Sequence, residues 1–154
     1  MRRLAQQSFI VVVLAGVMGL GITASQAQDD AANIIKYRQN VMESQAGHFG
    51  AMGGIVQGQV PYRGHLAVHA AAIHGTSKMI PQMFPEGSGT GETRAKPEIW
   101  QQWSEFEQAA KKLEEESARL VEIAQGGDMK QITAQFLAVG KACKACHKPF
   151  RKRK

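Results

Sequence analysis

Residues 129–150 read MKQITAQFLAVGKACKACHKPF, and this stretch contains both cysteines of the 154-residue chain. Its apolar residues and its cysteines recur at alternating spacings of three and four, which is the period of a helix with one buried face. Asp128, just before the stretch, is a residue type that caps the first turn of a helix. We therefore predict a helix whose core-facing side carries two thiols. The repeating positions are Met129, Ile132, Phe136, Val139, Cys143, Cys146 and Phe150.

The segment before it shows the same pattern. Between Ile99 and Ala124 apolar and small residues keep this alternation over seven steps. Pro97 suits the first turn of a helix, and Gly126 and Gly127 end the pattern. A second helix of this kind predicts a partner for the first.

Residues 31–57 and 62–82 also carry apolar residues at helical spacing, and Pro61 separates them. The first of these segments is rich in glycine toward its end, so it either frays there or packs closely against a neighbour. Residues 83–96 form a loop, and no segment alternates with a period of two. The chain is therefore predicted to be all-α, an antiparallel four-helix bundle.

The N-terminus has the pattern of a secretory signal. A basic start, MRRLAQQS, is followed by fourteen mainly apolar residues, 9–22, a run too short to span a bilayer comfortably. Ser25 and Ala27 place small residues at the positions that a signal peptidase needs for a cut after Ala27. We predict a cleaved signal peptide, residues 1–27, and one mature domain, residues 28–154, in the periplasm.

Cys143, Cys146 and His147 lie on one side of a helical turn, because residues three and four apart share a face. CxxCH is typical of covalent haem attachment, in which two thiols add across the haem vinyl groups and the histidine binds the iron. A structural zinc site needs more ligands than this, a redox dithiol normally belongs to a strand–helix unit, and a disulfide within one turn would restrain almost nothing. The sequence predicts one covalently bound haem c with His147 as an axial ligand.

Three segments carry a family resemblance: KYRQNVM at residues 36–42, FPEGSGTGETRAKPEIW at 84–100 and GKACKACHKPFR at 140–151. With the predicted bundle, they resemble class II c-type cytochromes, the group that contains cytochrome c′ and the c-556 type. The resemblance covers essentially the whole mature chain. It implies a cofactor-binding set: Arg38 near the haem propionates, Gln39 in the same segment, Thr93 and Arg94 at the haem edge, and Arg151 next to the proximal His147.

The residue across the haem from His147 decides between two functions. In the resembled family this distal residue lies four positions after the arginine of the YRQ segment, and here it is Met42. A methionine bound to iron gives a six-coordinate one-electron carrier, which is the function predicted. The alternative is a five-coordinate, high-spin cytochrome c′ in which Met42 is an apolar filler and the iron binds nitric oxide or carbon monoxide. No distal His/Arg pair can be assigned, so an enzyme is not expected.

The spacing of the other histidines and methionines makes them weaker candidates for iron ligands than Met42. A histidine in such a helix is more often a satisfied or exposed side chain than a ligand. His65 and His69 are four residues apart and could bind a metal, but two ligands make a weak site. The further residues able in principle to face iron are His48, His74, Met52 and Met79.

Basic residues gather at the C-terminus of a chain whose formal net charge is +6. With Lys141 and Lys144 they predict a docking surface for an acidic redox partner, although cations at a helix end also complement the helix dipole. The acidic run 114–116 balances the charge elsewhere, so nucleic-acid binding is not expected. The resemblance also allows a homodimer through the first two helices. The C-terminal cations are Lys148, Arg151, Lys152, Arg153 and Lys154.

Overall fold

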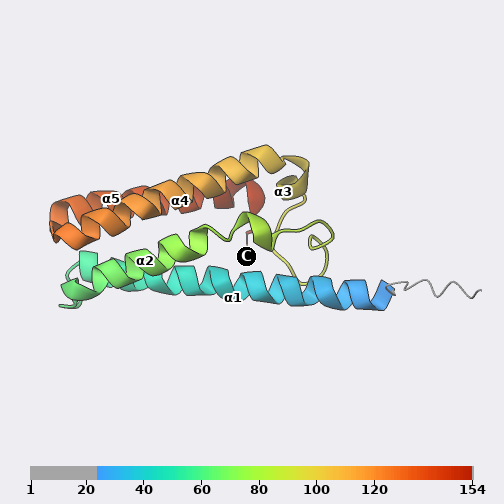
Figure 1. Ribbon diagram of the computed structural model, residues 1–154, viewed down its shortest axis with the longest axis horizontal. Coiled ribbons are helices and arrows are strands. Elements are labelled where there is room, and N and C mark those ends of the chain that lie inside the picture. The colour runs from blue at the N-terminus through green and yellow to red at the C-terminus, as the bar shows by residue number, and fades with distance from the viewer. Residues whose placement is uncertain (1–23, 154) are drawn as a thin grey trace, which may run out of the picture.

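Four principal helices form an antiparallel bundle in the computed structural model, which describes residues 24–153 (Figure 1). α1 and α2 form one layer and α4 and α5 the other, with the short α3 beside the start of α4. The predicted all-α four-helix bundle is confirmed. The principal helices are α1 (Ala24–Val56), α2 (Leu66–Ser77), α4 (Trp103–Gly126) and α5 (Met129–Phe150), and the short ones are α3 (Glu98–Gln101) and the 3-10 helices η1 (Arg63–His65) and η2 (Pro81–Met83).

The principal helices pack on one another in chain order, α1 with α2, α2 with α4 and α4 with α5. α5 then returns toward α1 but touches it only lightly. The side between α1 and α5 is therefore the least tightly packed part of the bundle.

All four principal helices contribute to the core. Met52 of α1, Leu66 of α2, Leu120 of α4 and Val139 of α5 are each at most 1% exposed. Full burial of an apolar side chain of this size contributes about 1.5–3 kcal/mol. The buried positions of α4 are those of the three–four repeat, as the sequence pattern predicted. On α5 the repeat also contributes buried residues, but Gln135 and Ala142 are buried outside it.

The junction between α4 and α5 has the predicted signals. Gly127 ends α4 with a φ of 75°, a left-handed conformation that suits glycine. The Asp128 carboxylate then accepts hydrogen bonds from the backbone N–H groups of Lys130 and Gln131, at 2.8 and 3.2 Å. These bonds satisfy donors of the first turn of α5, which have no partner within the helix.

The helix predicted over residues 62–82 is shorter than expected. It is α-helical only over α2, with a 3-10 turn on each side. Pro81 has no N–H to extend the helix, and its ring would clash with the carbonyl of Ser77, four residues earlier, where α2 ends.

The helix predicted from Pro97 to Ala124 is broken at Gln102, whose φ of −125° and ψ of 51° lie outside the helical region. The indole Nε1 of Trp100 donates to the carbonyls of Phe84 and Pro85, at 3.0 and 3.1 Å. These bonds hold α3 against the preceding loop, so that α3 and α4 become separate helices.

The glycine-rich end of α1 does not fray, because the helix continues to Val56. At Gly53 the alternative of close packing is correct, since an added Cβ would lie 3.6 Å from the Phe136 ring. A closer approach between these two helices is on α5, where an added Cβ at Gly140 would lie 2.9 Å from the Phe49 ring. α1 and α5 therefore meet through contacts between aromatic rings and glycines.

Residues 1–23 of the predicted signal peptide lie outside the described part of the chain. α1 begins at Ala24, and cleavage after Ala27 stays a prediction. Within residues 24–153, no helix combines the length and the apolar character needed to cross a membrane.

Candidate functional site

The last turns of α5 carry the predicted attachment residues. Cys143 and Cys146 are free thiols, both half-buried against the hydrophobic core. Burial raises the pKa of Cys143, and burial together with the nearby Cys143 raises the pKa of Cys146 to about 11. Both thiols are therefore protonated at neutral pH, whereas redox-active dithiols have lowered pKa values. The pair fits covalent attachment to an apolar group better than thiol redox chemistry.

His147 follows directly and is surrounded by cations. Its Nδ1 lies 3.5 Å from Nη1 of Arg151, one turn later. The ring keeps much of its surface in solvent, but its partial burial, and then the charges of Arg151 and Arg94, lower the pKa of His147. The imidazole is therefore neutral at pH 7, which is the form that binds a metal.

Arg38 on α1 is only 3% exposed and is held by the loop between η2 and α3. Its Nη1 donates to Ser88 Oγ at 2.8 Å, and its Nη2 donates to the Ser88 carbonyl and to Thr93 Oγ1, both at 2.7 Å. Its guanidinium carbon lies 4.7 Å from the centre of the Phe84 ring, a cation–π contact. Burial lowers the pKa of Arg38.

The same loop is tied to the segment that follows α5. Nε and Nη2 of Arg94 donate to the Lys152 carbonyl at 3.1 and 2.8 Å, and the Lys152 N–H donates to the Arg94 carbonyl at 2.8 Å. Ala95 and Arg151 form an isolated antiparallel bridge beside this pair. The loop therefore connects α1 with the end of the helix that carries the cysteines.

Gln39 and Met42 lie on α1 close to Arg38 in the chain. Gln39 Nε2 donates to the Glu92 carbonyl at 2.8 Å, a further link between α1 and the loop. Met42, one turn after Arg38, is half-buried and packs against the hydrophobic core. The structure thus brings Arg38, Gln39 and the loop together and places Met42 one turn further along the same helix.

Two residues of this region, Ser88 and Phe84, were not identified from the sequence. Ser88 accepts two hydrogen bonds from Arg38, and Phe84 lies under the guanidinium. Phe49 stacks on Phe136, with ring centres 4.2 Å apart. Ser88 and Phe84 lie in or beside an aperiodic loop, where no spacing rule applies. Phe49 falls on the helical stripe of Met42, and from the sequence it is one of the aromatic residues expected to form a haem cleft.

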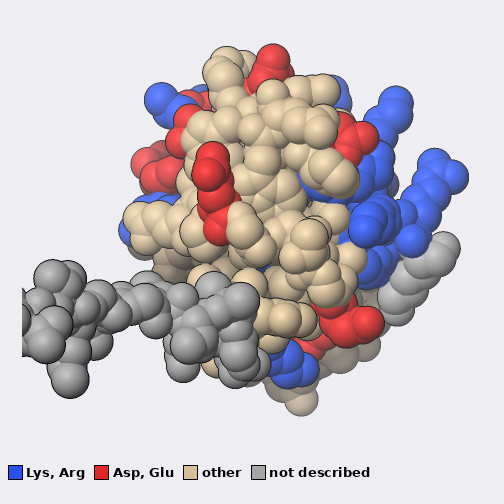
Figure 2. Space-filling view, turned by 90° about the vertical axis from the view of Figure 1, so that its right-hand side faces the viewer, with Lys and Arg blue, Asp and Glu red and all other residues tan. Residues whose placement is uncertain are grey.

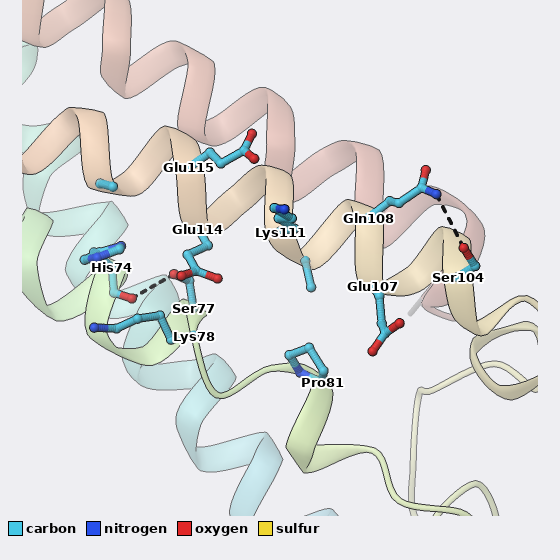
Figure 3. A pocket seen from close by; sticks show the side chains of 12 residues that line it. His74, Ser77, Lys78, Pro81, Ser104, Glu107, Gln108, Lys111, Glu114 and Glu115 are labelled. Atoms are coloured by element: carbon cyan, nitrogen blue, oxygen red, sulfur yellow. Dashed lines mark hydrogen bonds between the residues drawn. The ribbon is translucent and has the colours of Figure 1, made fainter.

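An open cavity of about 400 Å³ lies between α1 and α5, next to Cys143. A second open cavity, of about 520 Å³, lies between α2 and α4 (Figure 3). Side chains of both charges, such as Glu107, Lys111 and Glu114, line this second cavity. Of the histidines considered from the sequence it includes His74, a weaker candidate, and it includes none of the predicted haem-binding residues. The first cavity is lined by Phe49, Phe136, Leu137, Gly140, Lys141, Cys143 and Lys144.

The residues at the end of α5 and in the loop fit a haem. Among the residues that the structure describes, no carboxylate lies within ion-pair distance of Arg38, so the buried guanidinium has only neutral partners. A buried charge is costly unless an opposite charge offsets it, and a haem propionate is such a charge. Cys143 and Cys146 would hold the ring covalently, and the neutral imidazole of His147 would bind its iron.

A family model described as cytochrome c′ matches residues 33–151. The chain belongs to the cytochrome c′ family. It is 34% identical over 147 residues to cytochrome c′ of Rhodospirillum rubrum, which covers 95% of this chain and 98% of the relative. Cytochrome c′ of Pararhodospirillum photometricum is 35% identical over 118 residues, 76% of this chain and 94% of the relative. A nitric oxide complex of a mutant cytochrome c prime from Alcaligenes xylosoxidans has a TM-score of 0.75 and 33% identity, and the match covers 80% of this chain and 97% of that one.

Membership of the cytochrome c′ family corrects the predicted function. The expectation of a His/Met-ligated electron carrier is wrong, because the matched family and these relatives are cytochromes c′, the five-coordinate branch of the resembled group. Met42, half-buried among apolar side chains, then serves as a packing residue and not as an iron ligand, since its flexible thioether fills irregular space in the core. The family consists of haem proteins and is not typically enzymatic.

Proposed function

We propose that this protein is a haem c protein whose five-coordinate iron binds nitric oxide or carbon monoxide. The observation that carries the proposal is the likeness, over 80% of the chain, to a cytochrome c′ structure that contains nitric oxide. The site described above supports it with two thiols and an imidazole on α5, a buried cation on α1, and an apolar side chain one turn after that cation.

Each of these residues has a separate role. When bound, the haem would supply an iron that binds a small ligand. Cys143 and Cys146 would hold the haem covalently, each thiol adding across a vinyl group so that the sulfur gains a bond to one carbon and the proton goes to the other. His147 would bind the iron through a neutral imidazole nitrogen. Arg38 would pair with a propionate, which would offset its buried charge.

Met42 sets the ligand class in this proposal. As an apolar side chain on the distal face, it offers no hydrogen bond to a polar or charged ligand, and such a ligand would lose its hydration without compensation. Small uncharged gases lose little hydration free energy when they enter the same space. The distal wall therefore favours diatomic gases over anions and water.

Optical spectra of the purified haem protein test this proposal. We expect high-spin bands in the ferric and ferrous forms, ready binding of carbon monoxide by the ferrous form, and unchanged coordination in Met42→Ala. Met52→Ala is a matched control, because Met52 is a fully buried methionine on the same helix. Low-spin spectra with a far-red sulfur-to-iron band that Met42→Ala removes would refute five-coordination. A protein without covalently retained haem would refute the cofactor itself.

The proposal includes export to the periplasm and attachment of haem there. The pattern of residues 1–27 supports export. The mature protein from a periplasmic fraction should begin at Gln28 and have a mass increased by one haem. A product that retains residues 1–27 would contradict cleavage.

The basic end of the molecule is the proposed docking surface for an acidic partner that keeps the iron reduced. Lysine and arginine side chains gather along one side of the end view (Figure 2). Lys148, Arg151 and Lys152 are exposed, and Arg94 is bonded to Lys152. Reduction by such a partner should slow steeply with added salt. A rate independent of salt would exclude electrostatic docking.

A homodimer through α1 and α2 is also part of the proposal. The exposed residues of these helices include Gly47, Gly50 and Ala51 on α1 and Val68 on α2. Small residues allow helix backbones of two subunits to approach closely. Sedimentation of the haem protein should give the mass of a dimer, and Val68→Lys should give that of a monomer.

A further inference from the structure

Two histidines that have no role in the proposed haem site meet between α1 and α2. The Nδ1 atoms of His48 and His69 lie 2.9 Å apart, and their ring centres lie 5.2 Å apart. The distance between the ring centres exceeds the distance between the Nδ1 atoms by about two imidazole radii. Both Nδ1 atoms therefore lie close to the line that joins the ring centres, and each faces the other. Both residues are half-buried.

This pair shares one proton between two nitrogens. For a hydrogen bond, one Nδ1 must carry a hydrogen and the other must accept it. Burial, followed by the charges of His48 and His65, lowers the pKa of His69, so the His69 imidazole is neutral at pH 7. To bind a metal ion through both Nδ1 atoms, the donating ring would move its Nδ1 proton through solvent to its own Nε2, a change of tautomer that frees both Nδ1 lone pairs.

A third imidazole lies one turn away. His65 is four residues before His69 and directly precedes α2. It is exposed, and its ring stacks on that of Tyr62, with centres 5.2 Å apart. Within residues 24–153 no three metal-ligating side chains are already gathered as a site. His65 would therefore have to turn from Tyr62 toward His69, a side-chain rotation that its exposure permits.

We propose that His48, His69 and His65 bind one divalent transition-metal ion of the class that prefers imidazole, such as Zn²⁺, and so link α1 to α2. Zinc lies 2.0–2.1 Å from imidazole nitrogens in a tetrahedral site, so two such nitrogens are about 3.3 Å apart. The pair at 2.9 Å would open by about 0.4 Å, and both rings would turn so that their Nδ1 lone pairs converge on the metal instead of on each other. A water molecule completes the four ligands. From spacing alone His65 and His69 made a weak site, and His48 supplies the ligand from a second helix.

Equilibrium dialysis of the tag-free haem protein against Zn²⁺ tests the site, with bound zinc counted per chain. Where a preparation lacks haem, Cys143 and Cys146 are first alkylated, so that failure of the haem proposal leaves this test intact. The variants are His48→Gln, His69→Gln and His65→Gln. His74→Gln is the matched control, because His74 is also half-buried on α2 but its Nδ1 lies 3.3 Å from Ser117 Oγ.

We expect one zinc ion per chain in the wild type and in His74→Gln. Removing an outer group that only hydrogen-bonds to a metal ligand weakens metal binding roughly 10- to 100-fold. His48→Gln or His69→Gln removes a ligand itself, so either should weaken zinc binding by more than this, and His65→Gln should weaken it less. Zinc should also shift the imidazole ¹⁵N signals of His48 and His69 in the wild type, a measurement that needs no variant. Equal zinc affinity in His48→Gln and wild type, or unmoved signals, would overturn the site and leave a plain hydrogen bond between two helices.

Discussion

Replacing Gly89 with alanine should destabilise the protein, because the ring of Trp100 occupies the space of the new methyl group. A Cβ at Gly89 would lie 2.8, 3.1 and 3.3 Å from three ring atoms of Trp100. The ring cannot withdraw freely, since its Nε1 is bonded to the carbonyls of Phe84 and Pro85. The substitution therefore strains the same loop whose Ser88 holds Arg38.

The expected cost follows from two opposing effects. Forcing an extra methyl group into a packed site costs about 1–3 kcal/mol. If the indole moves away instead, two hydrogen bonds of about 0.5–1.5 kcal/mol each are lost. This movement therefore costs about as much free energy as the steric overlap that it relieves. Alanine also restricts the unfolded chain, which stabilises the protein by about 0.4–1 kcal/mol. The free energy of unfolding should fall by roughly 1–2 kcal/mol.

Urea unfolding of wild type and Gly89→Ala measures this loss. Gly64→Ala is the control, because no neighbouring atom lies within 4 Å of a Cβ there, so only the unfolded-chain effect should remain and the protein should be more stable by about 0.4–1 kcal/mol. In a Trp100→Phe background the larger ring is gone, so Gly89→Ala should cost less than half as much. An equal cost in both backgrounds, or a Gly89→Ala protein as stable as wild type, would refute the steric argument.

Three further perturbations test other parts of the structure. Asp128→Ala should lower the free energy of unfolding by about 0.5–2 kcal/mol, because α5 loses its N-cap, and an unchanged urea midpoint would contradict this. Cys146→Ser should leave haem attached by one thioether, so its pyridine haemochrome band should move to longer wavelength, and an unmoved band would exclude Cys146 from attachment. Hydrogen bonds from Lys112 and then Gln135 lower the pKa of Glu116, so Glu116 stabilises the fold above its ordinary pKa and loses this effect as pH falls through the lower folded value. Gln135→Leu should therefore reduce the dependence of the free energy of unfolding on pH in the acid range. Identical slopes in wild type and Gln135→Leu would argue against the hydrogen bond from Gln135 to Glu116.

The sequence predicted the parts of the fold that depend on local spacing. α5 extends over the whole predicted repeat, from Met129 to Phe150, and Asp128 and Gly127 mark the junction before it. Such signals are local because a cap satisfies donors of its own helix and a left-handed glycine needs no distant partner. The residues predicted to attach the haem could also be found from a local signal, since CxxCH fits within one helical turn.

The contacts that break helices or bury charges lie far apart in the sequence. The bend at Gln102 depends on the bonds of Trp100 to Phe84 and Pro85. Arg38 finds Ser88 fifty residues later in an aperiodic loop. No periodicity can predict such a pair, because its members have no fixed spacing. The family resemblance placed Arg38 and Thr93 near one haem edge, and the structure adds that they bond directly to each other.

The error about Met42 has the same origin. A helical stripe gives the direction in which a side chain points, and Met42 shares its stripe with Arg38, but coordination depends on how far α1 lies from α5. That distance is set by contacts between the helices, among them the ring of Phe49 against Gly140. An iron–sulfur bond needs a separation fixed to a fraction of an ångström, whereas an apolar wall tolerates much more. The same methionine can therefore serve either function, and only packing between helices distinguishes them.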